Sequence, residues 1–318
     1  MTPSTDPTFP TPAPIRTLGF AAFRLLGPVA GTTAQKLASS PSSPSSPSSL
    51  LGRSAGQSVM AETLRLQGEE PPRAWWQRLI GSSPLGSAGR SWFRGALGEI
   101  AVGQVLRGLG SEWTVLHAVP VGAGASDIDH VLIGPPGVFT LNTKNHAGKK
   151  VWVGERALLV DGHRQHYLSH ARHEAARAAK RLSAVVGEPV PVTPVLVLIA
   201  PKDLTVKQRP AGVHVITDRR LLRWLRRRRP VLAPEQVARI TAAAVGPNTW
   251  HNSPVPSEDP IALQERFAEL RASVRSAQHR RALWELALLI GGVAAAVNVG
   301  PDLLAALLGA GPGFGANA

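Results

Sequence analysis

Two runs of β-forming residues joined by a Gly-Pro-Pro-Gly turn constrain the fold of this chain most strongly, and they cover 127–134 and 138–144. Side chains alternate between the two faces of a strand, so Asn142 and Lys144 share one face of the second run. A hairpin of this kind brings these two residues close to Asp129 at one end of a sheet. A metal-dependent phosphodiesterase needs this arrangement, except that one carboxylate is missing because residue 142 is an asparagine.

Hydrophobic periodicity along the rest of the chain predicts an α/β fold. One amphipathic helix begins at Ser91 and stops at Gly110, and an Ala- and Arg-rich helix covers Tyr167–Val186 before Gly187. The apolar run Val192–Ala200 has the length of a strand that is covered on both faces. Further strands are predicted at 113–119, 150–153, 157–160 and 213–216, and further helices at 218–228 and 234–244. This order of elements indicates a mixed β-sheet sandwiched between helices.

Composition divides the chain into segments. Residues 1–85 are rich in Pro, Ser, Thr and Gly, and they include the repeat S-P-S-S-P-S-S-P-S-S at Ser40–Ser49. Such a segment buries too little apolar surface to offset its chain entropy, so we expect a disordered tail. The predicted order is this tail at 1–85, an α/β domain at 91–228, a helix and linker at 229–260, a polar helix at 261–281, an apolar helix at 282–299 and a short apolar, Gly-rich tail at 300–318.

The charge of the chain favours polyanionic partners. The formal net charge is +14 and the sequence pI is about 11.4, which suits nucleic acid or an anionic membrane face. The alternative is that the many arginines reflect composition alone, because they occur amid abundant Ala, Gly and Pro. Two clusters illustrate the choice between a phosphate-binding surface and a solvated helix face: Arg223 with Arg226–Arg229, and the helical stripe of His166, His170, His173 and Arg177.

An apolar run near the C-terminus predicts a membrane anchor. Ala282–Val299 has 18 residues, or about 27 Å of helix, which matches a thin hydrocarbon core. Arg280 and Arg281 would keep its N-terminal side in the cytoplasm. The chain has no cysteine, which excludes disulfides and thiolate zinc sites and suits a reducing compartment. We therefore expect a cytoplasmic domain anchored to the inner or plasma membrane and not secreted; the alternative is a buried or oligomerising helix, because Glu285 is costly in lipid.

Two sequence blocks carry a resemblance to a known family. They are G-A-L-G-E at Gly95–Glu99 and D-I-D-H-V-L-I-G-P-P-G-V-F-T-L-N-T-K-N-H-A-G-K at Asp127–Lys149. In this order they resemble the NERD family, the nuclease-related domain, over roughly Trp92 to Arg228. The resemblance implies a restriction-endonuclease-like core similar to that of PD-(D/E)XK nucleases: a four-stranded mixed sheet with flanking helices, a divalent-metal site and a role in DNA processing.

The resemblance also implies which residues form the site. The family pattern places its helix acid at Glu99, its strand acid at Asp129 and its catalytic lysine at Lys144, with Mg²⁺ or Mn²⁺ as the cofactor. Mg²⁺ prefers oxygen ligands, so Asp129 and Asn142 are the expected metal ligands. The chain departs from the family at Asn142, where an acid is usual. Asp127 shares a face with Asp129 and is a candidate for the missing charge; the alternative is a solvated residue at the start of the strand.

Three functions remain open at this point. The first is a metal-dependent phosphodiesterase acting on DNA, with Glu99, Asp129, Asn142 and Lys144 as catalytic residues. The second is a catalytically inactive module that binds nucleic acid at the membrane. The third is a membrane-associated scaffold whose basic charge meets anionic lipid.

Overall fold

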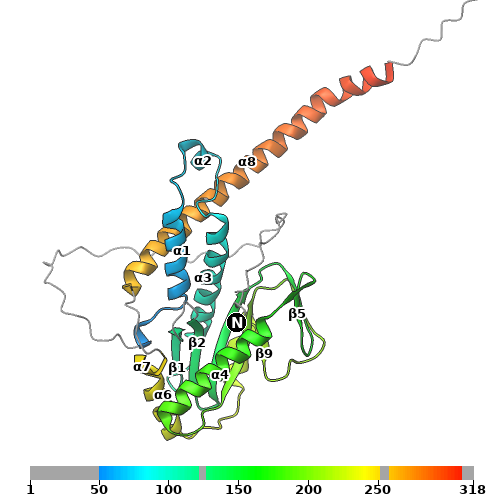
Figure 1. Ribbon diagram of the computed structural model, residues 1–318. Coiled ribbons are helices and arrows are strands. Elements are labelled where there is room, and N and C mark those ends of the chain that lie inside the picture. The colour runs from blue at the N-terminus through cyan, green and yellow to red at the C-terminus, as the bar shows by residue number, and fades with distance from the viewer. Residues whose placement is uncertain (1–49, 122–126, 251–257, 310–318) are drawn as a thin grey trace, which may run out of the picture. The chain divides into compact units, whose positions relative to one another are not determined.

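The computed structural model describes residues 50–121, 127–250 and 258–309, with the backbone alone for residue 247 and for 295–309 (Figure 1). Its main sheet has five strands in the order β1-β2-β3-β7-β9. The first three strands are antiparallel neighbours, whereas β3, β7 and β9 are parallel. The sheet is therefore mixed, as predicted. Its strands are β1 Thr114–Pro120, β2 Asp127–Gly134, β3 Gly137–Asn145, β7 Val192–Ile199 and β9 His214–Thr217.

A second sheet of four strands follows β3 in the chain. Its order is β6-β5-β4-β8, and only β4 and β8 are parallel within it. Asp161 and Gly162, both with positive φ, form the two-residue turn between β5 and β6. The expected single four-stranded sheet is therefore wrong, because two further strands extend the β4–β5 hairpin. The strands are β4 Lys150–Val153, β5 Leu158–Val160, β6 His163–Gln165 and β8 Asp203–Val206.

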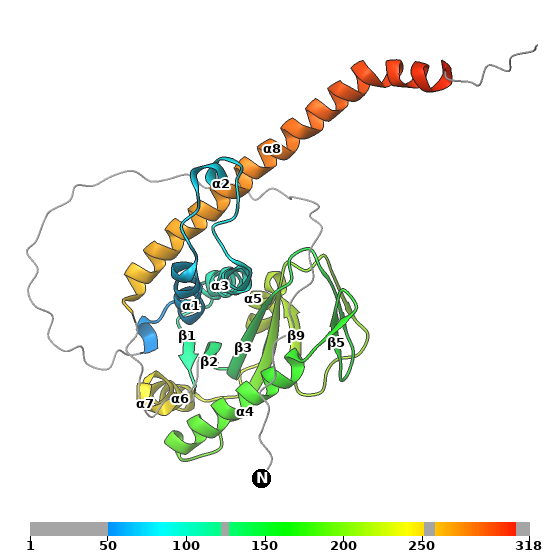
Figure 2. The same ribbon diagram turned by 45° about the horizontal axis from the view of Figure 1, so that its top comes forward.

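Helices cover both faces of the main sheet (Figure 2). Helix α3, Ser87–Leu106, packs Val102 and Leu106 onto one face together with α5, Asp218–Arg226. Helix α4, Tyr167–Val186, packs Ala178 and Leu182 onto the other. Two short helices, α6 Pro234–Val245 and α7 Pro247–Trp250, contribute to the second of these cores. The helix predicted at Tyr167–Val186 is confirmed, and it ends at Gly187 in a left-handed conformation.

The predicted tail is too long. Residues 1–49 lie outside the described part of the chain, but residues 50–80 form η1 Leu50–Gly52, α1 Gln57–Glu69 and α2 Trp75–Leu79. Met60 of α1 is only 1% exposed and packs in one core cluster with Phe93 of α3. The Pro- and Ser-rich repeat stops at Ser49, and the apolar residues that follow it are sufficient to pack against α3. The predicted boundary at residue 85 is wrong because the Pro- and Ser-rich composition ends at Ser49, well before that residue.

One long helix, α8, covers Pro260–Gly309. The polar helix, the apolar helix and part of the C-terminal tail, predicted as separate segments, are therefore continuous in backbone. Buried residues mark one face of its first part: Leu263, Phe267, Leu270, Val274 and Ala277. Among the helices of the described residues, none has the length and apolar character needed to cross a membrane. The span predicted at Ala282–Val299 extends past Ala294, after which only the backbone is described, and it stays a prediction.

Candidate functional site

Strands β2 and β3 separate at the end that carries the predicted site residues. Their antiparallel register runs from Gly134 opposite Gly137 to His130 opposite Leu141 and stops there. Beyond this point the backbone amide of Thr143 donates to Oδ2 of Asp129 at 2.6 Å. The main chain of β3 remains paired with β7 on its other side. A side-chain carboxylate thus occupies the fork where the two strands part.

Asn142 and Lys144 point to the face of the sheet that α4 covers. Their parallel partners on β7 are Leu196 and Leu198, which pack with Leu168 and other residues of α4. Residues in register on neighbouring strands share a face. The alternation predicted from the sequence is therefore confirmed for these two side chains.

Lys144 is held beside the start of α4. Its Nζ lies 5.6 Å from the centre of the Tyr167 ring, within the range of a cation–π interaction. The Tyr167 ring also stacks on His146, with ring centres 5.5 Å apart. Because no carboxylate that the structure describes forms a close ion pair with Lys144, its ammonium group is positioned by an aromatic face and remains available to a negatively charged group.

A carboxylate that the sequence reasoning missed faces Asn142. The Nδ2 group of Asn142 donates to Oε1 of Glu174 on α4 at 2.7 Å. The sequence did contain a signal for it: Glu174 falls on the stripe of buried small residues Ala171, Ala175 and Ala178, at helical spacing. An acid on the buried face of a helix needs a partner or a cation, and this criterion identifies Glu174 without a structure.

Glu99 approaches the fork from the opposite layer. It lies on α3 and is only 7% exposed. The neighbouring Gly98 allows close packing of α3 on β3, since a Cβ there would lie 3.3 Å from side-chain carbons of Thr143 and Asn145. Burial, followed by the negative charge of Asp129, raises the pKa of Glu99 well above its usual value, whereas Lys144 acts in the opposite direction. The Glu99 carboxyl group thus interacts electrostatically with both Asp129 and Lys144 at the open end of the sheet.

Acidic groups outnumber basic groups at this fork. Burial raises the pKa of Asp129, and the Lys144 ammonium and the Thr143 amide offset part of that effect. Burial and the charge of Asp129 raise the pKa of Glu174 to about 7. Together with Glu99, three carboxyl groups interact with Lys144, and Arg177 acts in addition on Glu174. Such a group of acids gains stability from an additional cation.

Two oxygens of the site fit a cation. Oδ1 of Asn142 and Oε2 of Glu174 are buried, and neither has a hydrogen-bond partner among the described residues. Buried acceptors are normally satisfied, and these are the oxygen types that Mg²⁺ and Mn²⁺ prefer. Within the described ranges, no three His, Asp or Glu side chains converge closely enough to hold a metal by themselves. A hydrated Mg²⁺ commonly takes only one or two protein carboxylates, and Asp129, Glu174 and Asn142 carry the oxygen donors that such an ion uses.

Asp127 has a different environment. Its Oδ2 lies 3.4 Å from Nη2 of Arg53 and accepts a hydrogen bond from the hydroxyl of Ser58 on α1. The Asp127 carboxylate therefore connects β2 to residues 53–58, at the start of α1. Glu174, which contacts Asn142 directly, is therefore a better candidate than Asp127 for the acid that is missing at position 142.

The comparison with protein-family models agrees with the sequence resemblance. Residues 94–199, about a third of the 318-residue chain, match the family model of the nuclease-related domain, NERD. This range contains Glu99, Asp129, Asn142, Lys144 and Glu174. Neither the search of curated proteins nor that of solved structures found a match to the chain.

Proposed function

We propose that the nuclease-related domain of this chain is a divalent-metal-dependent phosphodiesterase that acts on DNA. The observation that carries the proposal is the hydrogen bond between Asn142 and Glu174. It places a carboxylate beside the position where the family pattern has an acid and this chain has an amide. In this proposal α4, and not β3, supplies the second carboxyl group of the active site.

The roles of the residues follow from their positions. Asp129, Glu174 and the Asn142 oxygen would hold Mg²⁺ or Mn²⁺, which, when bound, would polarise a phosphoryl oxygen and lower the pKa of a coordinated water. Lys144 would orient the attacking water or offset the charge that develops on the phosphate oxygens. Glu99 would support the site from α3, because its carboxyl group interacts electrostatically with both Asp129 and Lys144.

The surface of α4 supports a nucleic-acid substrate. Arg172 and Lys180 are exposed on the helix that carries Glu174. A hollow further along the helix is lined by Arg177, Lys180 and Arg181. Basic side chains of this kind bind the phosphate backbone without reading sequence. They would bring the phosphodiester backbone close to the fork.

The test is DNA cleavage by the purified full-length chain with Mg²⁺ or Mn²⁺. Lys144→Ala should reduce cleavage by about 10²–10³-fold, because one positioned charge or proton-transfer group contributes about that much. Lys207→Ala is the matched control, since Lys207 is exposed and directly follows β8, a strand of the second sheet. Absence of cleavage by the folded protein with either metal, on single- and double-stranded DNA, would contradict the proposal.

A second candidate function is a catalytically inactive module that binds DNA. The amide at Asn142, where the family usually has an acid, favours it. This alternative predicts salt-dependent DNA binding that is unchanged in Lys144→Ala, with no cleavage by the parent protein. Fluorescence anisotropy with labelled DNA, measured alongside the cleavage assay, separates the two functions.

A further inference from the structure

Helix α8 changes its surface at Ala282. Before this residue the helix buries a single face against α1 and α3. From Ala282 to Ala294 every side chain is exposed, including Leu288 at 73% and Leu289 at 65%. Glu285 is the only charged residue in this stretch, and Arg281 neutralises it through an ion pair of 2.9 Å. One continuous helix thus has a buried face in its first part and exposed apolar side chains on all sides in residues 282–294.

The distribution of these apolar side chains favours lipid over a second helix. At about 100° per residue, the large exposed side chains fall on all sides of the helix and leave no polar face. A partner helix would cover only one seam. The exposed side chains are Leu283, Trp284, Leu286, Leu288, Leu289, Ile290 and Val293.

Helix α2 lies beside the start of this segment. Nε1 of Trp284 donates to the carbonyl oxygen of Leu79 at 3.1 Å. The approach requires glycine at position 81, since φ there is +77° and a Cβ would lie 2.4 Å from the carbonyl oxygen of Ala277. On its outer side α2 exposes Trp75 and Trp76, at 76% and 50%. Tryptophans are enriched where a protein meets the membrane–water interface, and two elements here present them together.

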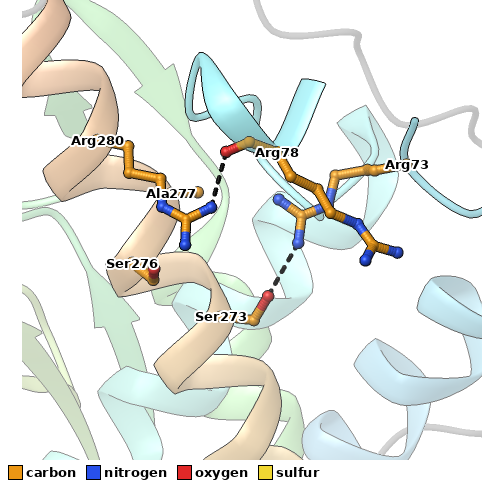
Figure 3. A pocket seen from close by; sticks show the side chains of 6 residues that line it. All are labelled: Arg73, Arg78, Ser273, Ser276, Ala277 and Arg280. Carbon is orange, nitrogen blue, oxygen red and sulfur yellow. Dashed lines mark hydrogen bonds between the residues drawn. The ribbon is translucent and has the colours of Figure 1, made fainter. Parts of the chain in front are cut away.

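An arginine-lined hollow lies between α2 and α8 (Figure 3). It has a volume of about 370 Å³ and is lined by Arg73, Arg78, Arg280, Ser273, Ser276 and Ala277. Nη2 of Arg73 donates to the Ser273 hydroxyl at 3.0 Å, and Arg280 donates to the carbonyl oxygen of Arg78 at 2.9 Å. None of these three arginines forms an ion pair with an acid in the described part of the chain. Burial and the charges of the other two arginines lower the pKa of Arg73, as expected where positive charge lacks a counterion.

We propose that α2 and residues 282–294 of α8 form a membrane-binding surface, whose arginine hollow receives the phosphate of an anionic phospholipid headgroup. Apolar side chains would enter the acyl region while the guanidinium groups remain at headgroup level. Charge complementarity selects anionic lipid, because three arginines and two serines meet in one hollow without an acid. This inference goes beyond the proposed phosphodiesterase activity and does not depend on it.

Co-sedimentation of the full-length chain with vesicles tests the proposal. The chain should bind vesicles of mixed phosphatidylcholine and phosphatidylglycerol more tightly than vesicles of phosphatidylcholine alone. Arg78→Gln should weaken binding to the mixed vesicles about fivefold, the effect of one basic residue at an anionic surface. Arg219→Gln, an exposed arginine of α5, is the matched control and should leave binding unchanged.

The apolar contribution is tested by Leu288→Gln combined with Leu289→Gln. Both side chains are exposed, so the thermal midpoint should remain that of the parent while vesicle binding falls by about tenfold or more. Three results would overturn the proposal. They are no binding of the folded chain to either vesicle, equal binding to both vesicles that is insensitive to Arg78→Gln, or lipid-free self-association in sedimentation velocity that the double variant abolishes.

Discussion

The amide of Asn142 on β3 donates to the carboxylate of Glu174 on α4 across 2.7 Å. The acid of the site and the strand position usually occupied by an acid are thus adjacent in space, though 32 residues apart in sequence. The exchange keeps a second carboxyl group within the electrostatic influence of Asp129. It also assigns to α4 a part in the site that the strand pattern alone does not predict.

Removing the charge of Glu174 should weaken metal binding. Glu174→Gln preserves an acceptor for the Asn142 amide but carries no charge, so the fold should survive. We expect Mn²⁺ affinity, measured by isothermal titration calorimetry, to fall by at least about 10–100-fold, since even residues that only orient metal ligands commonly contribute this much. Glu155→Gln, at an exposed position in the β4–β5 turn, should bind as the parent does. Equal affinity in the two variants would exclude Glu174 as a ligand.

Moving the charge back to the strand should restore the site. In the double variant Asn142→Glu with Glu174→Gln, the acid and the amide exchange places while the hydrogen bond between them is retained. Mn²⁺ affinity should recover to within a few fold of the parent, because the charge beside Asp129 is the same. Calorimetry on the parent, the single variant and the double variant gives this comparison. If the double variant binds Mn²⁺ as weakly as Glu174→Gln alone, the position of the charge matters more than its presence.

A buried histidine pair should make stability depend on pH. Nδ1 of His117 lies 2.8 Å from Nδ1 of His130; burial, followed by the charge of Arg107, lowers the pKa of His117 to about 4. The unfolded chain binds this proton near pH 6.5, so the contribution of His117 to stability is full above that pH and is lost as pH falls toward 4. His117→Gln should reduce the loss of unfolding free energy between pH 7 and pH 5 by about 2 kcal/mol. Urea unfolding at the two pH values measures this loss of free energy. An equal loss in the parent and in His117→Gln would mean that His117 does not cause the pH dependence.

The first part of α8 should contribute to the stability of the domain. The Phe267 and Phe93 rings pack with centres 5.4 Å apart, and Phe267 is 3% exposed. Phe267→Ala should lower the free energy of unfolding by about 3–5 kcal/mol. Ile261→Ala, at a position 67% exposed in the same helix, should change it by less than about 0.5 kcal/mol. Similar values for both variants would mean that α8 does not unfold together with the domain.

Local patterns in the sequence predicted the central fold well. The alternation along β2 and β3, the helix at Tyr167–Val186 and the apolar strand β7 follow from periods of 2 and 3.6 residues that tertiary packing did not override. The short strands β6 and β8 were missed because they contain no buried residue, so no apolar face marks them in the sequence. Helix α1 was missed because its apolar residues follow a low-complexity repeat, and composition was extended past the point where it changed.

The site was predicted in part, for a physical reason. Asp129, Asn142 and Lys144 come from one hairpin, and strand geometry relates their positions directly. Glu174 comes from a helix whose rotation about its axis depends on packing, and the sequence shows only that an acid lies among small buried residues. The ion pair of Asp127 with Arg53 was beyond prediction for the same reason, because the segment around Arg53 was assigned to the tail.

The carboxylate of Asp129 has a structural role in addition to its proposed role in the metal site. It accepts the Thr143 amide where the ladder between β2 and β3 ends, and it is the strand acid of the proposed site. Asn at this position would retain an acceptor with less charge, whereas Ala would leave a strand amide without its partner. The sheet therefore needs an oxygen acceptor at position 129 whether or not the protein cleaves DNA. Conservation of such a residue among distant relatives would then reflect the strand end at the fork more than the reaction.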